Sequence, residues 1–117
     1  MKLLIVSACL LSIIFSFCNK TEKKIECILI ERPVSITGCG ILSFTYAMKF
    51  QKINNKTEFI GFLFCPDFYG RDFFQAGQKY HVIITDTANI TKADIIVNKY
   101  KDENLPYYGI KEMGLIK

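Results

Sequence analysis

The sequence predicts an all-β domain, a small barrel of five to six strands with an irregular or short helical element between the third and fourth strands. Half of the 117 residues are hydrophobic and 22% are charged, a composition that favours a folded chain over a disordered tail or a collagen-like repeat. Apolar and polar side chains alternate along several segments, as in strands with one buried face. Glycine, proline and asparagine separate these segments, as they do in turns.

Residues 1–17 have the features of an export signal. Lys2 is followed by an uncharged run that ends at Phe17. This run, about 15 residues long, suits the apolar core of a signal peptide and is shorter than the roughly 20 residues of a spanning helix. We therefore expect residues 1–17 to be removed, residues 18–24 to form a tether, and residues 25–117 to form a single β-barrel domain.

Cys18 stands where the apolar segment meets the polar one. The position resembles that of the cysteine in bacterial lipoprotein signals, which becomes the first mature residue and receives lipid. Phe17 departs from that pattern, because a small residue normally precedes the cysteine. The resemblance implies a lipid anchor at Cys18 that holds the protein at a membrane surface without spanning it. Simple secretion and a retained membrane anchor are the alternatives.

Export places the other cysteines where disulfides persist. If Cys9 is removed and Cys18 is lipidated, three cysteines are left, enough for one internal bridge. Cys39 lies between two glycines and Cys65 precedes a proline, so both are expected at strand edges. The sequence predicts a Cys39–Cys65 bridge and a buried Cys27 thiol. Without lipidation, four cysteines allow three pairings, and Cys18 with Cys27 is then one of the options.

The first three strands are expected in the first half of the domain. Residues 25–31 carry apolar side chains on both faces, which predicts a strand buried on both sides that ends before Pro33. Residues 41–53 alternate between an apolar and a mostly polar face, which is typical of a sheet with one face on the core. A turn at residues 54–56 then leads into an apolar strand at residues 58–65.

The second half is expected to hold the irregular element and the last strands. Residues 66–77 break the alternation and predict a compact loop or a single helical turn. Strands follow at residues 78–85, 94–100 and 107–116. Such an order, with a long second strand, fits a small closed barrel of the OB type. A β-sandwich of the immunoglobulin kind is the alternative, and it would need about seven strands.

Two local patterns resemble known families. Phe74–Val82, in which a glycine turn leads into an alternating strand, resembles netrin-type OB modules, including tissue inhibitors of metalloproteinases. The combination of Cys39-Gly40, Cys65–Gly70, Phe73-Phe74 and Gly77 behind a signal is similar to small secreted or lipid-anchored proteins of Bacteroidetes-type bacteria, for which no activity is assigned. The first resemblance implies a secreted inhibitor or interaction module whose mature amino terminus inserts into a partner.

Groups suited to catalysis or metal binding are few. His81 is the only histidine, and the alternation places it on one face of a strand with Ile83. One histidine and three dispersed cysteines do not supply the closely spaced ligands of a zinc site. We therefore expect no catalytic residue, no metal and no cofactor. A small hydrolase built around His81 is the least favoured alternative.

The segment between the third and fourth strands carries the residues of a candidate binding patch. Aromatic side chains beside a basic one can bind a protein or a glycan, although aromatics in a small domain also complete its core. The candidates are Phe68, Tyr69, Arg71, Phe73 and Phe74.

The charge balance gives no support for a nucleic-acid partner. Removal of Lys2 with the signal leaves 14 of the 15 basic side chains against 11 acidic ones, a net charge of +3. We therefore expect a non-enzymatic, extracytoplasmic β domain. It would act as a binding or structural component of the cell envelope, attached as a lipoprotein, or would be secreted or periplasmic if Cys18 is not modified.

Overall fold

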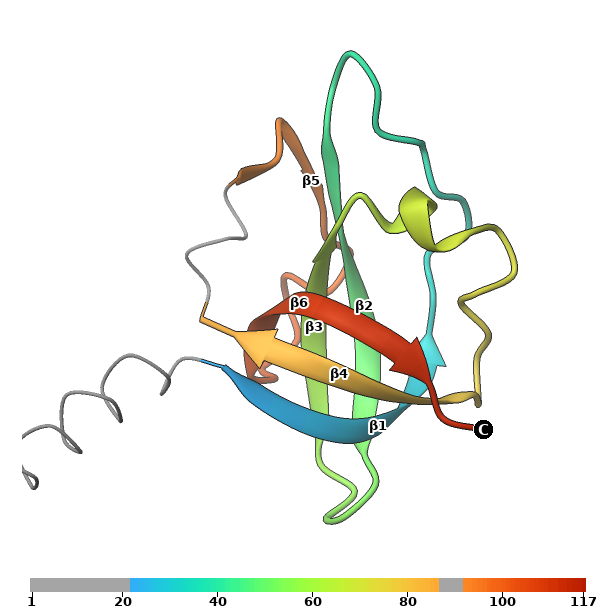
Figure 1. Cartoon of the computed structure of the whole chain (residues 1–117). Helices are drawn as coiled ribbons and strands as arrows, with labels where there is room; N and C mark the ends of the chain where they lie inside the picture. Colours follow the sequence, from blue (N-terminus) through green and yellow to red (C-terminus); the bar gives the residue numbers. More distant parts are fainter. Residues whose placement is uncertain (1–21, 87–91) are drawn as a thin grey trace, which may run out of the picture.

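Six strands and one short helix follow one another in the part of the chain that the computed structural model describes, residues 22–86 and 92–117. The helix is a single 3-10 turn, so no helix in these residues has the length and apolar character to cross a bilayer. The elements are β1 (Lys23–Glu31), β2 (Phe44–Lys52), β3 (Glu58–Phe64), η1 (Pro66–Tyr69), β4 (Lys79–Thr85), β5 (Ile95–Val97) and β6 (Tyr107–Leu115) (Figure 1).

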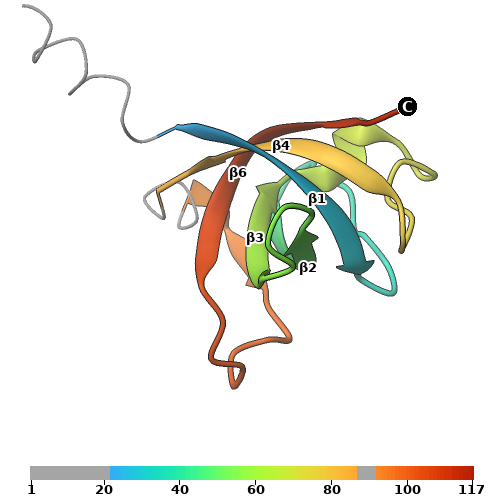
Figure 2. The same cartoon turned by 90° about the horizontal axis from the view of Figure 1, so that it is seen from below.

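Five of the strands close into a barrel in the order β1-β4-β6-β3-β2, because β1 also pairs with β2. The β3–β6 pair is parallel, and the other four pairs of the barrel are antiparallel. The short strand β5 adds to β2 in parallel beyond the barrel. Figure 2 shows the closed wall from below. The predicted all-β, OB-like barrel is confirmed, including the short helical element between the third and fourth strands.

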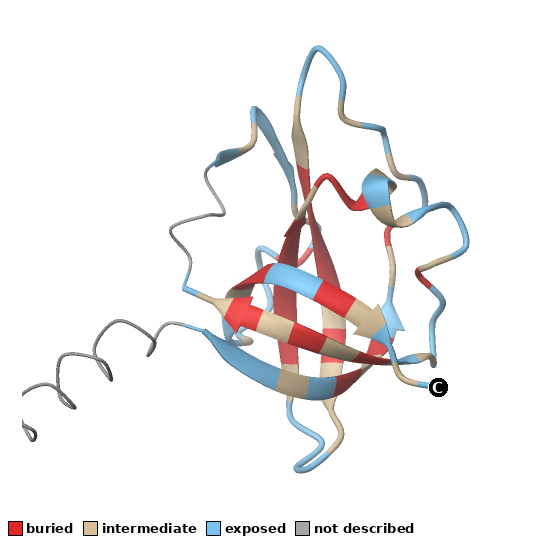
Figure 3. Cartoon of the chain, in the orientation of Figure 1, coloured by how far each residue is buried: buried red, intermediate tan, exposed pale blue. Residues whose placement is uncertain are grey.

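The main core fills the barrel with inward-facing side chains from all five strands. Along β4, buried and half-buried residues alternate, as the sequence pattern predicts (Figure 3). The rings of Phe50 and Phe59 stack with their centroids 5.3 Å apart. Gly61 faces them, and a Cβ atom at this position would lie 2.9 Å from Phe50 Cε2 and 2.5 Å from Ile110 Cδ1. The absence of a side chain at Gly61 therefore lets β2, β3 and β6 pack closely.

The prediction that β1 is buried on both faces is wrong. Cys27 and Leu29 face the core and are fully buried, but Ile28 is half-buried and Ile30 is exposed. The reason is that no second layer covers the outer side of β1. The strand also begins at Lys23, inside the segment predicted as tether.

The outer face of β2 and β3 carries a second apolar cluster that the sequence pattern does not predict. Ala47 of β2 and Ile60 and Phe62 of β3 are buried there against Tyr100. The predicted fifth strand ends at Val97 instead of residue 100, so the chain leaves β2 and folds back over this face. Residues 98–105 thus cover a side of β2 that was expected to face solvent.

Candidate functional site

The Cys39–Cys65 disulfide is formed, with the two Cα atoms 5.6 Å apart, and the predicted pairing is confirmed. It joins the loop between β1 and β2, residues 32–43, to the loop between β3 and β4, residues 65–78. The two loops lie at one end of the barrel, opposite the β2–β3 hairpin (Figure 1). We call this end the disulfide pole. Because disulfides persist in oxidising compartments, the bridge indicates an extracytoplasmic environment.

The structure separates the five residues of the candidate patch. Phe74 is fully buried, and Tyr69 and Phe73 are half-buried against the main core. Ring centroids lie 4.9 Å apart for Tyr69 and Phe73 and 5.0 Å apart for Phe73 and Phe74. These three aromatics close the end of the barrel. Phe68, which is 76% exposed, and Arg71 are the two members at the surface.

A hydroxyl fixes the buried part of this loop to β4. Tyr80 Oη donates to the carbonyl oxygen of Phe73 at 2.6 Å and accepts from the backbone N–H of Gln75 at 2.9 Å. Burial raises the pKa of Tyr80, and the hydrogen bond from Gln75 acts in the opposite direction. The loop that carries Phe68 and Arg71 is therefore held by these buried contacts after Arg71 and by the Cys39–Cys65 bridge before Phe68.

Other large apolar side chains are exposed on the disulfide pole. Val34 is 95% exposed and Ile41 is fully exposed in the β1–β2 loop, and Leu42 is about half exposed. Sequence reasoning placed Ile41 and Leu42 in a strand, so it missed them as surface residues. The glycines on both sides of Cys39 were the signal for a loop at this point. With Phe68, these side chains give both loops of the pole an apolar surface, as interaction sites often have.

Two arginines line a pocket of about 380 Å³ between the loops, together with Ser35, Ile36, Asp67 and Gly70. Arg32 Nη1 donates to the carbonyl oxygen of Phe74 at 2.7 Å, which holds its guanidinium in place. Within residues 22–86 and 92–117, neither Arg32 nor Arg71 forms an ion pair. Guanidinium groups bind carboxylates in two-pronged geometry, so this pocket can take an acidic group of a partner.

Asp67 lies beside the disulfide, and its Oδ1 atom is buried and has no hydrogen-bond partner among the residues that the structure describes. Oxygen and sulfur atoms of Asp67, Cys39 and Cys65 all lie within 4.8 Å of one another. The two sulfurs are bonded to each other, so they do not offer the thiolates that bind metals. The same bond removes Cys65 as a thiol nucleophile.

His81 lies on the outer face of β4, as the alternation predicts. Its imidazole covers Gly114 of β6, where an added Cβ atom would lie 2.5 Å from His81 Nε2. The histidine therefore contributes to the contact between β4 and β6. Its neighbour across the β1–β4 pair is Glu26.

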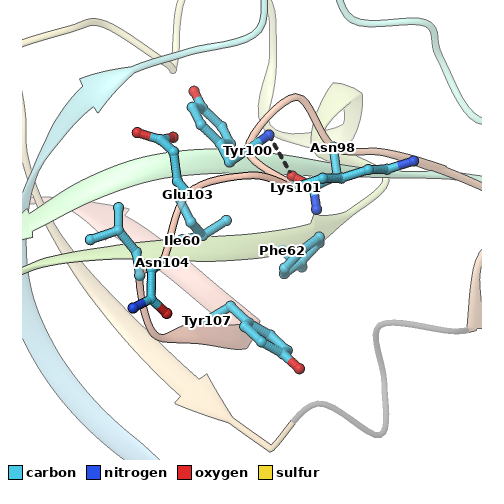
Figure 4. A pocket seen from close by; sticks show the side chains of 9 residues that line it. Ile60, Phe62, Asn98, Tyr100, Lys101, Glu103, Asn104 and Tyr107 are labelled. Atoms are coloured by element: carbon cyan, nitrogen blue, oxygen red, sulfur yellow. Dashed lines mark hydrogen bonds between the residues drawn. The ribbon is translucent and has the colours of Figure 1, made fainter.

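The face of strands 2 and 3 that binds ligands in many OB barrels is occupied here by the chain itself. A pocket of about 270 Å³ lies at its edge, lined by Phe62, Asn98, Tyr100 and neighbouring residues (Figure 4). Tyr100 is buried in this face, and its hydroxyl donates to Glu31 Oε1 at 2.7 Å. Lys99 Nζ lies 2.6 Å from the same oxygen. These contacts tie residues 98–105 to the barrel, so we place the candidate site at the disulfide pole.

The contacts of Glu31 predict a pH dependence of stability. Hydrogen bonds from Lys99 and then from Tyr100 lower the pKa of Glu31 below its ordinary value of 4.5. As the pH falls, the unfolded chain binds this proton first. The stabilisation is therefore present above about pH 4.5 and is lost as the pH drops through the lower pKa of the folded state.

We expect Tyr100→Phe to reduce this effect, because one of the two hydrogen bonds to the carboxylate is removed. Urea unfolding at about pH 3 and about pH 6 should show a smaller gain in unfolding free energy for the variant than for the wild type. Tyr107→Phe removes an exposed hydroxyl that does not contact Glu31 and serves as the control. An equal gain in Tyr100→Phe and wild type would contradict the prediction.

Comparisons with known proteins found no match among protein-family models, curated proteins or solved structures. Cys18, the predicted lipidation site, lies outside the described residues.

Proposed function

We propose that the protein is an exported, non-enzymatic binding module of the cell envelope, held at a membrane surface by lipid on Cys18. The disulfide pole would be the surface that contacts a partner protein or glycan. The observation that carries this proposal is the bridge itself, because it joins two loops that both carry exposed apolar side chains. A covalent link reduces the disorder that the loops would otherwise lose on binding.

The composition of the pole favours a protein partner. Phe68, Val34 and Ile41 offer apolar contacts on the two loops. The pocket between these loops holds the guanidinium groups of Arg32 and Arg71 and also Asp67, with which neither arginine forms an ion pair. A polypeptide with a carboxylate beside apolar side chains complements both features. Arginine is also one of the residue types enriched at the hot spots of known interfaces.

The intact mass of the protein isolated from its native cells tests the anchor. We expect the mass of residues 18–117 with a lipid added and with two hydrogens lost to the Cys39–Cys65 bridge. An unmodified amino terminus at Cys18 would overturn the anchor and favour the second candidate, a secreted interaction module of netrin type, for which an OB-like barrel is also expected. Recovery with Met1 attached and all thiols reduced would overturn export altogether.

Site-specific photo-crosslinking in native membranes tests the binding surface. A photoreactive residue at Ile41 should give a crosslinked product, whereas one at Ile30, exposed on the barrel wall, should not. The exchange Arg71→Glu should abolish the product at position 41, because the pocket then repels a carboxylate. Lys101→Glu makes the same charge change away from the disulfide pole and should leave the crosslinked product at position 41 unchanged. Equal products at positions 41 and 30 would contradict this role of the pole.

A further inference from the structure

A second charged surface lies where β1 begins. Residues 23–26 of β1 and residues 52–55 at the end of β2 line a pocket of about 350 Å³. The backbone N–H of Ile53 donates to the Glu26 carbonyl oxygen at 3.1 Å, which holds the two segments together. The lysines among these residues, and one more in the adjoining hairpin turn, form what we call the lysine surface: Lys23, Lys24, Lys52 and Lys56.

The charges of the lysine surface are not neutralised by the rest of the domain. In residues 22–86 and 92–117, the ion pairs involve Lys49, Lys99 and Lys111 and none of the four. Glu22, the acid that precedes β1, lies 2.6 Å from Lys111 Nζ. Glu26 is the one acidic residue among those that line the pocket. Lys23, Lys24 and Lys56 are exposed, whereas Lys52 is half-buried with its Nζ atom 5.9 Å from the centroid of the Tyr108 ring. The surface therefore has an excess of positive charge, most of it on three exposed side chains.

The short connection between Cys18 and β1 limits the distance between the lysine surface and a membrane that holds the lipid. Five residue steps separate Cys18 from Lys23, and an extended chain covers at most about 3.6 Å per residue, or roughly 18 Å in all. Electrostatic attraction between exposed charges acts over about 8 Å at physiological salt. A lipid on Cys18 would therefore keep the start of β1 within roughly 18 Å of a bilayer, a range that includes the distances at which the lysines attract its headgroups.

We propose that the lysine surface binds the anionic headgroups of the membrane to which the protein is attached. This inference rests on the proposed anchor at Cys18. The β2–β3 hairpin lies next to β1 in the view of Figure 2, at the end of the barrel opposite the disulfide pole in Figure 1. Contact through the lysine surface holds the barrel with the hairpin towards the bilayer and turns the disulfide pole outwards, where a partner can reach it.

Vesicle binding by the unacylated mature chain, residues 18–117 with Cys18→Ser, separates the lysines from the lipid. We expect binding to vesicles with about one-third phosphatidylglycerol in phosphatidylcholine, and none to phosphatidylcholine alone. Exchange of the four lysines of the surface for glutamine should weaken binding at least tenfold. In the matched control, four exposed lysines elsewhere are exchanged for glutamine, so both variants have the same net charge. These lysines are Lys79, Lys92, Lys101 and Lys117.

Equal binding to both vesicle types, or an equal loss in the two lysine variants, would overturn the proposal. Inorganic phosphate should release the protein no better than chloride at the same ionic strength. Stronger release by phosphate would mean a site for free phosphate and would also overturn the proposal.

The intact mass of the native protein tests the anchor independently of the lysine surface. An unmodified Cys18 together with lysine-dependent vesicle binding would refute the anchor alone, and a lipidated Cys18 without such binding would refute the lysine surface alone.

Discussion

Phe74→Ala is expected to lower the free energy of unfolding by about 3 to 5 kcal/mol. Phe74 lies in a loop by sequence but is fully buried, with its ring against Phe73 and Tyr69. Truncation removes the transfer free energy of the ring and leaves a cavity at the end of the barrel. Guanidinium chloride denaturation, followed by circular dichroism, measures the loss. Because such a loss can unfold a small domain, Phe74→Leu provides a milder variant, with an expected loss of about 1 to 2 kcal/mol.

Phe68→Ala in the same loop is the matched control. Phe68 is mostly exposed, so its removal should change the unfolding free energy by no more than about 0.5 kcal/mol. The pair thus separates an aromatic side chain that completes the core from one that faces a partner. A loss at Phe68 as large as that at Phe74 would contradict the burial on which this distinction depends.

The strands and the disulfide could be predicted because each depends on local pattern. Alternation fixes which side chains of a strand share a face, and the expected segments 58–65 and 107–116 differ from β3 and β6 by a single residue. The bridge followed from Cys39 in a glycine turn and Cys65 at the end of an apolar strand. Both signals lie within a few residues of the feature they predict.

The burial of the outer face of β2 could not be predicted in this way. It depends on where residues 98–105 return after β5, which no pattern within β2 records. Tyr100 reaches this face only because β5 adds to the edge of β2 and then ends at Val97. The sequence also could not assign Phe74 to the core and Phe68 to the surface. The two lie in one irregular segment, where no period separates inside from outside.

Loss of the Cys39–Cys65 bridge is expected to lower the free energy of unfolding about as much as Phe74→Ala does. Cys39 and Cys65 are 26 positions apart, and closure of such a loop restricts the unfolded chain by about 3.5 kcal/mol in the chain-entropy model. The free energy of unfolding of the double variant Cys39→Ser/Cys65→Ser should therefore be lower by that amount, as measured by denaturant unfolding. Reduction of the wild-type bridge should reproduce the loss without any substitution.

The reactivity of Cys27 provides a second measure of the stability lost when the bridge is removed. Its thiol is buried inside the barrel, and burial raises its pKa to about 12, so the reactive thiolate is suppressed while the barrel is closed. Alkylation of Cys27 then requires opening of the barrel, and its rate follows the population of open molecules. A loss of about 3.5 kcal/mol raises that population by roughly two to three powers of ten. We expect alkylation of Cys27 to accelerate by a similar factor in the double variant, as measured by mass spectrometry under native conditions. If the rate were the same with and without the bridge, the disulfide would not stabilise the barrel around Cys27.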